Sequence, residues 1–314
     1  MNVLRRNFLL FATLAAAAAA STAALPQTQM PAVGSAGKVE RSAAAVPDFS
    51  GLWRHPSLPG LEPPASGPGP VTNRSRTRTG TSNWNELVGD HGNPILKPWA
   101  AEIVKKHGEI SKAGLTYPTP SSQCWPQPVP YIFWTFITQV VQTPDKVTFL
   151  YADPGILFRQ VRLNQPHPAH VTPSWDGDSV GHFEGDTLVI DTVGIKTERP
   201  YAMVDWFGTP YTGALHVVER YRLLDYADAK EALERDTKEN VHVMLNSIDR
   251  NYRGKHLQLE FTVEDEGAFT MPWTATITYL PSLVPWEEWV CAENIHEYHN
   301  HRDADVPRAD KPDF

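Results

Sequence analysis

The sequence predicts a mainly β protein with minor helix: a single antiparallel β-barrel or strongly curved sheet, lipocalin-like in outline, behind an irregular N-terminal arm. Two observations carry this prediction. From residue 131 onward, about nine short apolar or alternating segments follow one another at hairpin spacing. The two clearest, 257–263 and 273–280, place every second residue on one apolar face, as a strand with one buried face does.

Residues 1–24 form the segment that we expect to be removed from the mature chain. They begin with basic residues, continue with an apolar run and end in small residues, which is the layout of a secretory signal. Arg5 and Arg6, followed by Phe8 and Leu9, resemble the twin-arginine export signal, and a Sec signal is the alternative. The apolar run is shorter than the roughly 20 residues of a membrane span, so we expect export to the periplasm without a membrane anchor.

The formal net charge of −8 narrows the choice of partner. Loss of Arg5 and Arg6 takes this charge to −10, because residues 1–24 contain no acidic residue. An acidic protein repels nucleic acid and anionic membrane surfaces, so we expect neither as a partner. We expect an apolar or aromatic small molecule instead, and the sequence leaves the oligomeric state open.

Three further segments flank the predicted barrel. Residues 25–46 are small and polar without periodicity, which is typical of a disordered linker. Proline-rich stretches then precede one predicted helix over 96–114, with Pro98 in its first turn and Gly114 at its end. The predicted boundaries are a signal at 1–24, a linker at 25–46, an irregular arm with one helix packed on the barrel at 47–130, a barrel at 131–290 and a C-terminal tail at 291–314.

The barrel segments are identified by their length, their alternation and the turn residues between them. The first, 131–141, is apolar on both faces and is expected to be covered on both sides. One helix is expected within the barrel region, over 226–238. The predicted strands cover 131–141, 147–151, 156–163, 179–183, 187–193, 215–223, 241–245, 257–263 and 273–280.

The two cysteines, Cys124 and Cys291, leave two interpretations open. In an oxidising periplasm they can form a disulfide, which requires that the fold brings them together. Each can equally be a small buried apolar residue.

Three charged residues fall where strand alternation expects apolar side chains. Arg159, Glu219 and Asp191 each share a strand face with apolar neighbours. Because a buried charge is unfavourable unless it is paired, we expect Arg159 to pair with Glu219 or Asp191 inside the barrel. Such a pair is either a structural ion pair of the core or the polar anchor of a small-molecule pocket.

The stretch 165–186 is rich in histidines, acids and glycines. His170 and His182 are candidate general acids or bases, because a histidine near a carboxylate can titrate near neutral pH. The acids beside Gly177 and Gly185 are explained as turn formers. The candidate substrate-binding aromatic residues are Trp175, Tyr221 and Trp134.

Two alternative chemistries have partial motifs. Residues 177–181 fit the Gly-x-Ser-x-Gly spacing around Ser179, but a nucleophile elbow stands between a strand and a helix, and here a strand follows. His296, His299 and His301 form an alternative metal site, although their spacing matches no specific metal motif. The sequence contains no phosphate-binding or metalloprotease motif, so we expect no cofactor.

Several motifs together resemble a widespread group of exported bacterial β-rich proteins. The matching residues are Pro47-Asp48-Phe49-Ser50-Gly51-Leu52-Trp53, Trp175-x-Gly177-x-Ser179-x-Gly181-x-Phe183-Glu184-Gly185-Asp186-Thr187-Leu188-Val189-Ile190-Asp191-Thr192, Glu219-Arg220-Tyr221-Arg222, Pro272-Trp273 and Cys291-Ala292-Glu293-Asn294. Phe183 departs from the group, which often has tryptophan there. The resemblance implies export and a β-rich single domain, and it implies no catalytic role.

From these residues we expect a periplasmic, cofactor-independent enzyme that performs proton-transfer chemistry, as a lyase, isomerase or dehydratase, on an apolar and aromatic small molecule. We expect His182 or His170 to be the base and Arg159 to stabilise negative charge. The acidic or orienting partners are Glu219 and Asp191. A lipocalin-like carrier of a hydrophobic ligand is one alternative, because it needs the pocket without the base. A metal-dependent hydrolase that uses the C-terminal histidines is the other.

Overall fold

The structure is a computed structural model that describes residues 46–134, 137–152, 157–197, 202–243, 245–286, 291, 297–298 and 301–303. The predicted signal at 1–24 and all but the last residue of the predicted linker lie outside the described residues. The described part of the chain is mostly β, with two α-helices.

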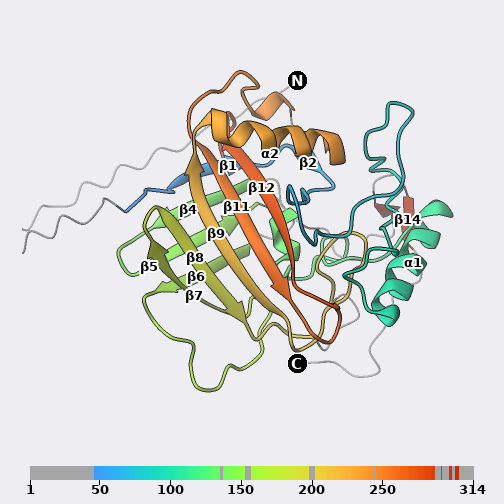
Figure 1. Cartoon of the computed structure of the whole chain (residues 1–314), viewed down its shortest axis with the longest axis horizontal. Coiled ribbons are helices and arrows are strands. Elements are labelled where there is room, and N and C mark those ends of the chain that lie inside the picture. The colour runs from blue at the N-terminus through green and yellow to red at the C-terminus, as the bar shows by residue number, and fades with distance from the viewer. Residues whose placement is uncertain are drawn as a thin grey trace, which may run out of the picture. The chain divides into compact units, whose positions relative to one another are not determined.

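A closed β-barrel is the main element of the described chain, as the sequence predicts (Figure 1). Its nine strands follow the order β1-β12-β11-β9-β8-β7-β6-β5-β4, and β4 pairs with β1 to close the ring. The strands are β1 (Gly51–Arg54), β4 (Ile137–Gln142), β5 (Lys146–Tyr151), β6 (Leu157–Leu163), β7 (Asp178–Glu184), β8 (Thr187–Val193), β9 (His216–Leu224), β11 (His256–Glu264) and β12 (Trp273–Pro281).

The barrel is antiparallel at every pairing but one. β6 and β7 run in parallel, and they pair over two positions only, Arg162 with Val180 and Leu163 with Gly181. The long connection 164–177 carries the chain back before β7 begins, so β7 runs in the same direction as β6. This seam therefore has fewer paired positions than the neighbouring β7–β8 and β8–β9 ladders.

The predicted barrel boundary at residue 131 is wrong, because one barrel strand precedes it and the residues that directly follow it are not a strand. β1 belongs to the barrel, although the sequence assigns it to the arm. The segment Tyr131–Trp134 forms a 3-10 helix, η1, and the next strand begins only at Ile137. The amides of Ile132 and Phe133 donate to the carbonyls of Pro128 and Pro130, which closes the helical turn. All four η1 side chains are buried, so an apolar run alone did not distinguish this turn from a strand.

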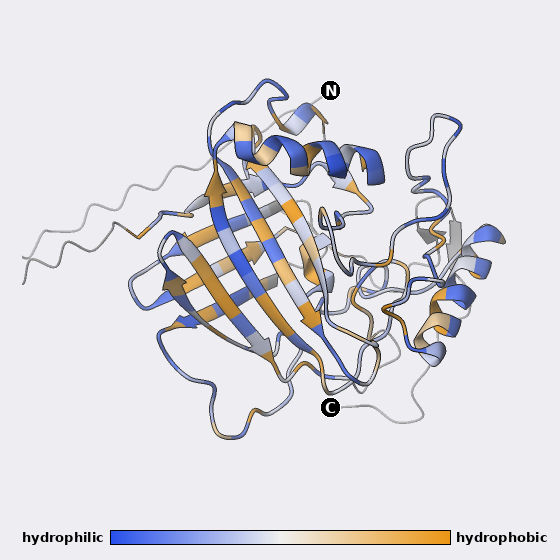
Figure 2. Ribbon diagram, in the orientation of Figure 1, coloured by the Kyte–Doolittle hydropathy of each residue, from blue (hydrophilic) through white to orange (hydrophobic). Residues whose placement is uncertain are grey.

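Alternation decides which side chains fill the barrel. Along β11 the residues Leu257, Leu259, Phe261 and Val263 are at most 1% exposed, as the pattern predicts. Figure 2 shows the same alternation of apolar and polar residues along the neighbouring strands. Burying a side chain of this size stabilises the fold by about 1.5–3 kcal/mol.

The shorter elements pack around the barrel. α2 lies against β9, β11 and β12 (Figure 1) and corresponds to the helix predicted at 226–238. α1 corresponds to the helix predicted at 96–114 and is followed by Gly114, whose φ of +74° favours glycine at a helix end. These elements are α1 (Pro98–Lys112), α2 (Tyr226–Glu239), η1 (Tyr131–Trp134), η2 (Leu245–Ser247), β2 (Ser57–Leu58) paired with β10 (Val241–His242), and β3 (Leu115–Thr116), β13 (Glu297–Tyr298) and β14 (His301–Asp303) in one sheet.

The C-terminal segment is attached at two places. A disulfide joins Cys124 to Cys291, with Cα atoms 5.6 Å apart and a sequence separation of 167. β14 pairs in parallel with β3. Of the two interpretations of the cysteines, the disulfide is therefore the one that the fold adopts. Among the described residues, no helix has the length and apolar character to cross a bilayer.

Candidate functional site

The interior of the barrel contains the ion pair expected from alternation. The two terminal nitrogens of Arg159 donate to the two carboxylate oxygens of Glu219, at 2.8 and 2.6 Å. Arg159 is 3% exposed and Glu219 is fully buried. Burial opposes the charge on the guanidinium, but Glu219 raises the pKa of Arg159 above its ordinary value. A fork-to-fork pair of this kind remains charged inside the protein.

Side chains occupy the space around this pair. The guanidinium carbon lies 5.2 Å from the ring centre of Phe149 and 5.7 Å from that of Phe133. The hydroxyl of Tyr221 donates to Glu219 at 3.1 Å, so this predicted substrate-binding residue is a partner of the ion pair. Arg159 and Glu219 therefore belong to a packed core, which is the structural interpretation of the pair.

His182 and Asp191 point away from that core, contrary to the expectation that they join Arg159 and Glu219 in one cavity. The side chain of His182 is 53% exposed, and its Nε2 lies 3.1 Å from Glu184. Asp191 is half-buried on the outer face, although its neighbours on β8 suggested an inward side chain. Alternation failed at Asp191 because the outer face of β8 is itself covered by the 164–177 connection, which makes both faces apolar.

Asp191 is the middle of a chain of alternating charges on the outer face. Its two oxygens lie 3.0 Å from Nε2 of His167 and 3.0 Å from Nε2 of His216. The other ring nitrogen of His167 lies 2.6 Å from Asp178, and that of His216 lies 3.3 Å from Glu264. The hydrogen bond to Asp191 raises the pKa of the His216 imidazole above its ordinary value. A neutral imidazole has only one N–H, so two carboxylate partners favour the protonated ring of His216. Arg162 extends the chain with a bidentate pair to Asp178.

The remaining predicted residues lie in separate places. His170 is exposed in the connection between β6 and β7. Trp175 packs edge-on against Trp125, with ring centres 5.7 Å apart. Trp134 is buried and stacks on Trp206. His296 and His299 lie outside the described residues, and His301 is known only as part of β14. No group of metal-binding side chains occurs among the described residues.

A second buried polar cluster joins α2 to β2 and β10. Asp236 accepts a hydrogen bond from Ser57 at 2.5 Å and lies 3.5 Å from Nε2 of both His55 and His242. Ser57, His55 and Asp236 are at most 2% exposed. The residue types are those of a hydrolase triad, but the serine donates to the acid instead of to a histidine. We therefore assign this cluster to the anchoring of α2.

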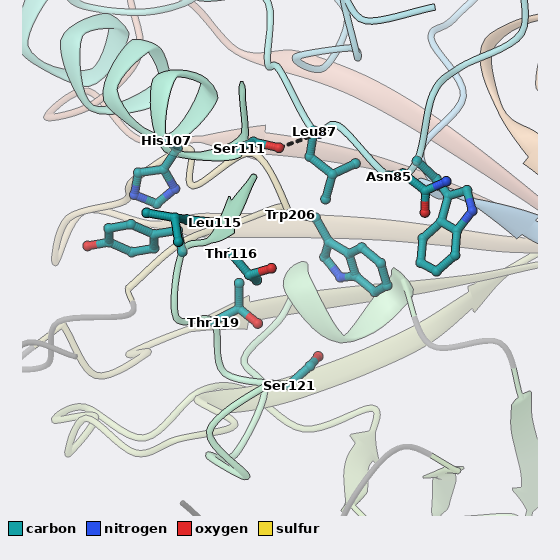
Figure 3. A pocket seen from close by; sticks show the side chains of 11 residues that line it. Asn85, Leu87, His107, Ser111, Leu115, Thr116, Thr119, Ser121 and Trp206 are labelled. Carbon is teal, nitrogen blue, oxygen red and sulfur yellow. Dashed lines mark hydrogen bonds between the residues drawn. The ribbon is translucent and has the colours of Figure 1, made fainter. Parts of the chain in front are cut away.

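A cavity of about 60 Å³ lies outside the barrel, beside α1 (Figure 3). Figure 3 shows His107 on one side and Trp206 on the other, with Leu87 beside Trp206. The exposed Asn85 contributes to the lining, so the cavity is in contact with solvent. The lining residues are Trp84, Asn85, Leu87, His107, Ser111, Leu115, Thr116, Tyr117, Thr119, Ser121 and Trp206.

Local hydrogen bonds hold the two walls of this cavity. The hydroxyl of Ser111 on α1 accepts from the amide of Leu87 at 2.8 Å, which fixes the arm against the helix (Figure 3). On the opposite wall, one carboxylate oxygen of Asp205 accepts from the amides of Phe207 and Thr209, which closes the turn that presents Trp206. The sequence thus builds both walls from short turns and one helix face.

His107 is the polar residue of the cavity with the most unusual surroundings. It is 7% exposed, and desolvation lowers the pKa of its imidazole to about 3, so the ring is neutral. Its ring lies on that of Tyr117, with centres 3.5 Å apart, and against the backbone of Gly208, where a Cβ would come within 1.7 Å of Nδ1. None of the described residues forms a hydrogen bond with the imidazole.

His107 is not among the histidines predicted from the sequence, which lie in the stretch 165–186 and in the C-terminal tail. The helical period contained the information: Ala100, Val104, His107 and Gly108 are the buried residues of α1, at spacings of four, three and one. A histidine in that apolar row, rather than on the polar face, was the available clue.

Comparisons with known proteins add no relative: no family model, no curated protein and no solved structure matches this chain. The candidate site therefore rests on its geometry.

Proposed function

We propose that this protein binds a small apolar ring compound in the cavity beside α1. The observation that carries the proposal is the lining itself, in which the rings of Trp84, Tyr117 and Trp206 surround a space in contact with solvent. Small-molecule sites are concave and largely aromatic, with a few polar groups that orient the ligand. The interior of the barrel offers less support, because a paired arginine and aromatic side chains fill the space around Glu219.

The size of the cavity limits the ligand. A cavity of about 150 Å³ holds benzene in a protein core, whereas this one measures about 60 Å³. A single ring therefore fits only with part of it at the opening, or with a shift of the half-buried lining. Fused ring systems are not expected to bind.

Binding without turnover is favoured over the proton-transfer enzyme expected from the sequence. His182 and His170 are exposed, and neither accompanies Arg159 and Glu219. His107 faces the cavity, but a pKa of about 3 makes it a weak base at neutral pH. Conversion of a bound ring compound by the purified protein would reverse this preference.

Export to the periplasm remains part of the proposal. The layout of residues 1–24 supports it. The disulfide between Cys124 and Cys291 supports it too, because such bonds persist in oxidising compartments.

Calorimetric titration with toluene tests the binding proposal. We expect saturable binding to the wild-type protein and at least a ten-fold weaker affinity for Thr116→Phe, since the added ring occupies the cavity. Thr148→Phe is the matched control, because Thr148 is a half-buried strand threonine on the barrel. Absence of toluene binding to the wild-type protein, or equal binding to both variants, would remove the cavity as the site.

A further inference from the structure

We propose that the cavity beside α1 selects an uncharged ring compound that carries a hydroxyl group, and that the imidazole of His107 accepts the hydrogen bond of this hydroxyl. The inference rests on the proposed binding function and names the class of ligand.

Among the described residues that line the cavity there is no aspartate, glutamate, lysine or arginine. A charged ligand would therefore lose its hydration without gaining a partner of opposite charge, which is strongly unfavourable. The cavity differs in this respect from the outer face of the barrel, where charged side chains are paired with one another. It favours a neutral ligand.

His107 supplies the second argument. More than nine-tenths of its surface is buried, and yet the described residues leave its ring nitrogens without a hydrogen bond. Buried polar groups in folded proteins are nearly always paired, and a site that holds an unpaired one discriminates against ligands that cannot pair with it. A ligand that bonds to the imidazole would remove this deficit.

The charge state of the imidazole decides what the ligand must offer. A neutral ring has one N–H and one lone pair, whereas a protonated ring has two donors and no acceptor. The lowered pKa keeps the lone pair available at neutral pH. A hydroxyl on an aromatic ring is a strong donor to such a lone pair, so a phenol satisfies both the apolar rings and His107.

The position of Trp206 is consistent with a ring in the cavity. Trp206 lies opposite His107 in Figure 3, and it stacks on Trp134 with ring planes 14° apart. Trp134 also contacts Phe207 edge-on, so three aromatic side chains hold this wall. A rigid aromatic wall opposite a hydrogen-bond acceptor suits a flat ligand that has a polar edge.

The test is calorimetric titration of the full-length protein at neutral pH with four probes: phenol, toluene, benzoate and benzylammonium. We expect phenol to bind roughly ten-fold more tightly than toluene, the discrimination that one net hydrogen bond provides. Both ions should bind more weakly than phenol. In His107→Leu the affinity for phenol should fall to that for toluene, while toluene is affected by less than two-fold. His107→Gln should recover part of the preference, because its amide can accept the same bond.

His170→Leu is the matched control, since His170 is exposed and outside the cavity. If His107→Leu does not fold, ¹⁵N-histidine spectra of the wild-type protein replace it: phenol should shift the ring nitrogen of His107 and toluene should not. Equal affinity for phenol and toluene in the wild type, or tighter binding of benzoate, overturns this inference alone. Absence of toluene binding to the wild-type protein overturns the proposed function itself.

Discussion

The interior of the barrel and the cavity beside α1 both bury a nitrogen-bearing side chain among aromatic rings, but the two side chains differ in their partners. In the barrel, Arg159 is held by both oxygens of Glu219 and lies over Phe149. In the cavity, His107 has ring contacts but no hydrogen bond among the described residues. Both terminal nitrogens of the guanidinium have a carboxylate partner and only its Nε lacks one, whereas neither ring nitrogen of His107 has a partner among the described residues. The cavity is therefore the region in which a ligand can supply a hydrogen bond that the described residues do not.

The two regions are also stabilised differently. Arg159 and Glu219 come from β6 and β9, strands held in a closed hydrogen-bonded ring. The cavity is built from the arm, one helix and short turns, with a disulfide close by: Sγ of Cys291 lies 4.0 Å from the carbonyl of Ser121. Perturbation of the barrel pair should thus affect stability, and perturbation of the cavity should affect binding.

The largest expected effect comes from the barrel. Glu219→Gln removes the charge that balances Arg159 and should lower the free energy of unfolding by about 3–5 kcal/mol, because an unpaired buried charge remains. Urea denaturation measures it. The double variant Arg159→Met with Glu219→Leu should recover most of the loss, and Glu102→Gln on the exposed face of α1 should have no effect. Wild-type stability of Glu219→Gln would show that the pair is not part of a packed core.

Removal of the disulfide should have the next largest effect. Cys124→Ser with Cys291→Ser opens a link across 167 positions and should lower the free energy of unfolding by about 2–4 kcal/mol. Because Ser121 lines the cavity, the affinity for toluene should fall as well, which the Glu219 variant should not cause while it is folded. Chemical denaturation of wild type under reducing conditions is the control. Unchanged toluene affinity in the double serine variant would separate the disulfide from the cavity.

Gly208→Ala tests whether the close contact between Gly208 and the imidazole of His107 positions this ring for binding. Gly208 has a φ of +75°, and a Cβ there would meet His107 at 1.7 Å. We expect a loss of about 1–3 kcal/mol in the free energy of unfolding and a loss of the preference for phenol, since the ring must move. Gly213→Ala is the control, because a Cβ at Gly213 meets nothing within 4 Å. An unaltered preference for phenol in Gly208→Ala would mean that the position of the His107 ring against Gly208 is not required for binding.

The smallest effect is the pH dependence of the outer charge chain. Hydrogen bonds from His216 and His167 lower the pKa of Asp191, and the bond to Asp191 raises the pKa of His216. The contribution of the Asp191 carboxylate to folding stability is therefore fully present above about pH 4, and it is lost as the pH falls through the lowered pKa of Asp191. The contribution of the protonated His216 to folding stability is fully present below about pH 6.5, and it is lost as the pH rises through the raised pKa of His216.

The stability difference between wild type and Asp191→Asn should thus be greatest between about pH 4 and pH 6.5, and it should reach about 1 kcal/mol at most because the groups are partly exposed. Urea midpoints across this range measure it. Asp186→Asn at the β7–β8 turn is the control, and a difference that keeps growing above pH 7 would contradict the assignment of charge to His216.

The class of fold follows from the sequence because alternation depends only on neighbours along a strand. The inner faces of β11 and β12, the hairpin turn at Gly185 with its φ of +63°, and the inward positions of Arg159 and Glu219 all agree with that pattern. Alternation does not decide between Glu219 and Asp191 as the partner of Arg159, since it predicts a strand face and not a partner.

The features of the fold and of the cavity that alternation does not predict were decided by the tertiary structure. The parallel seam, the burial of η1 and the outward side chain of Asp191 depend on segments that cover the strands from outside. The cavity depends on even more distant parts, because the arm, α1, β3 and the loop of Trp206 meet only when the chain is folded. His107 could be placed on the buried face of its helix from local period alone, but whether that face would meet a partner or an opening is a property of the packed molecule.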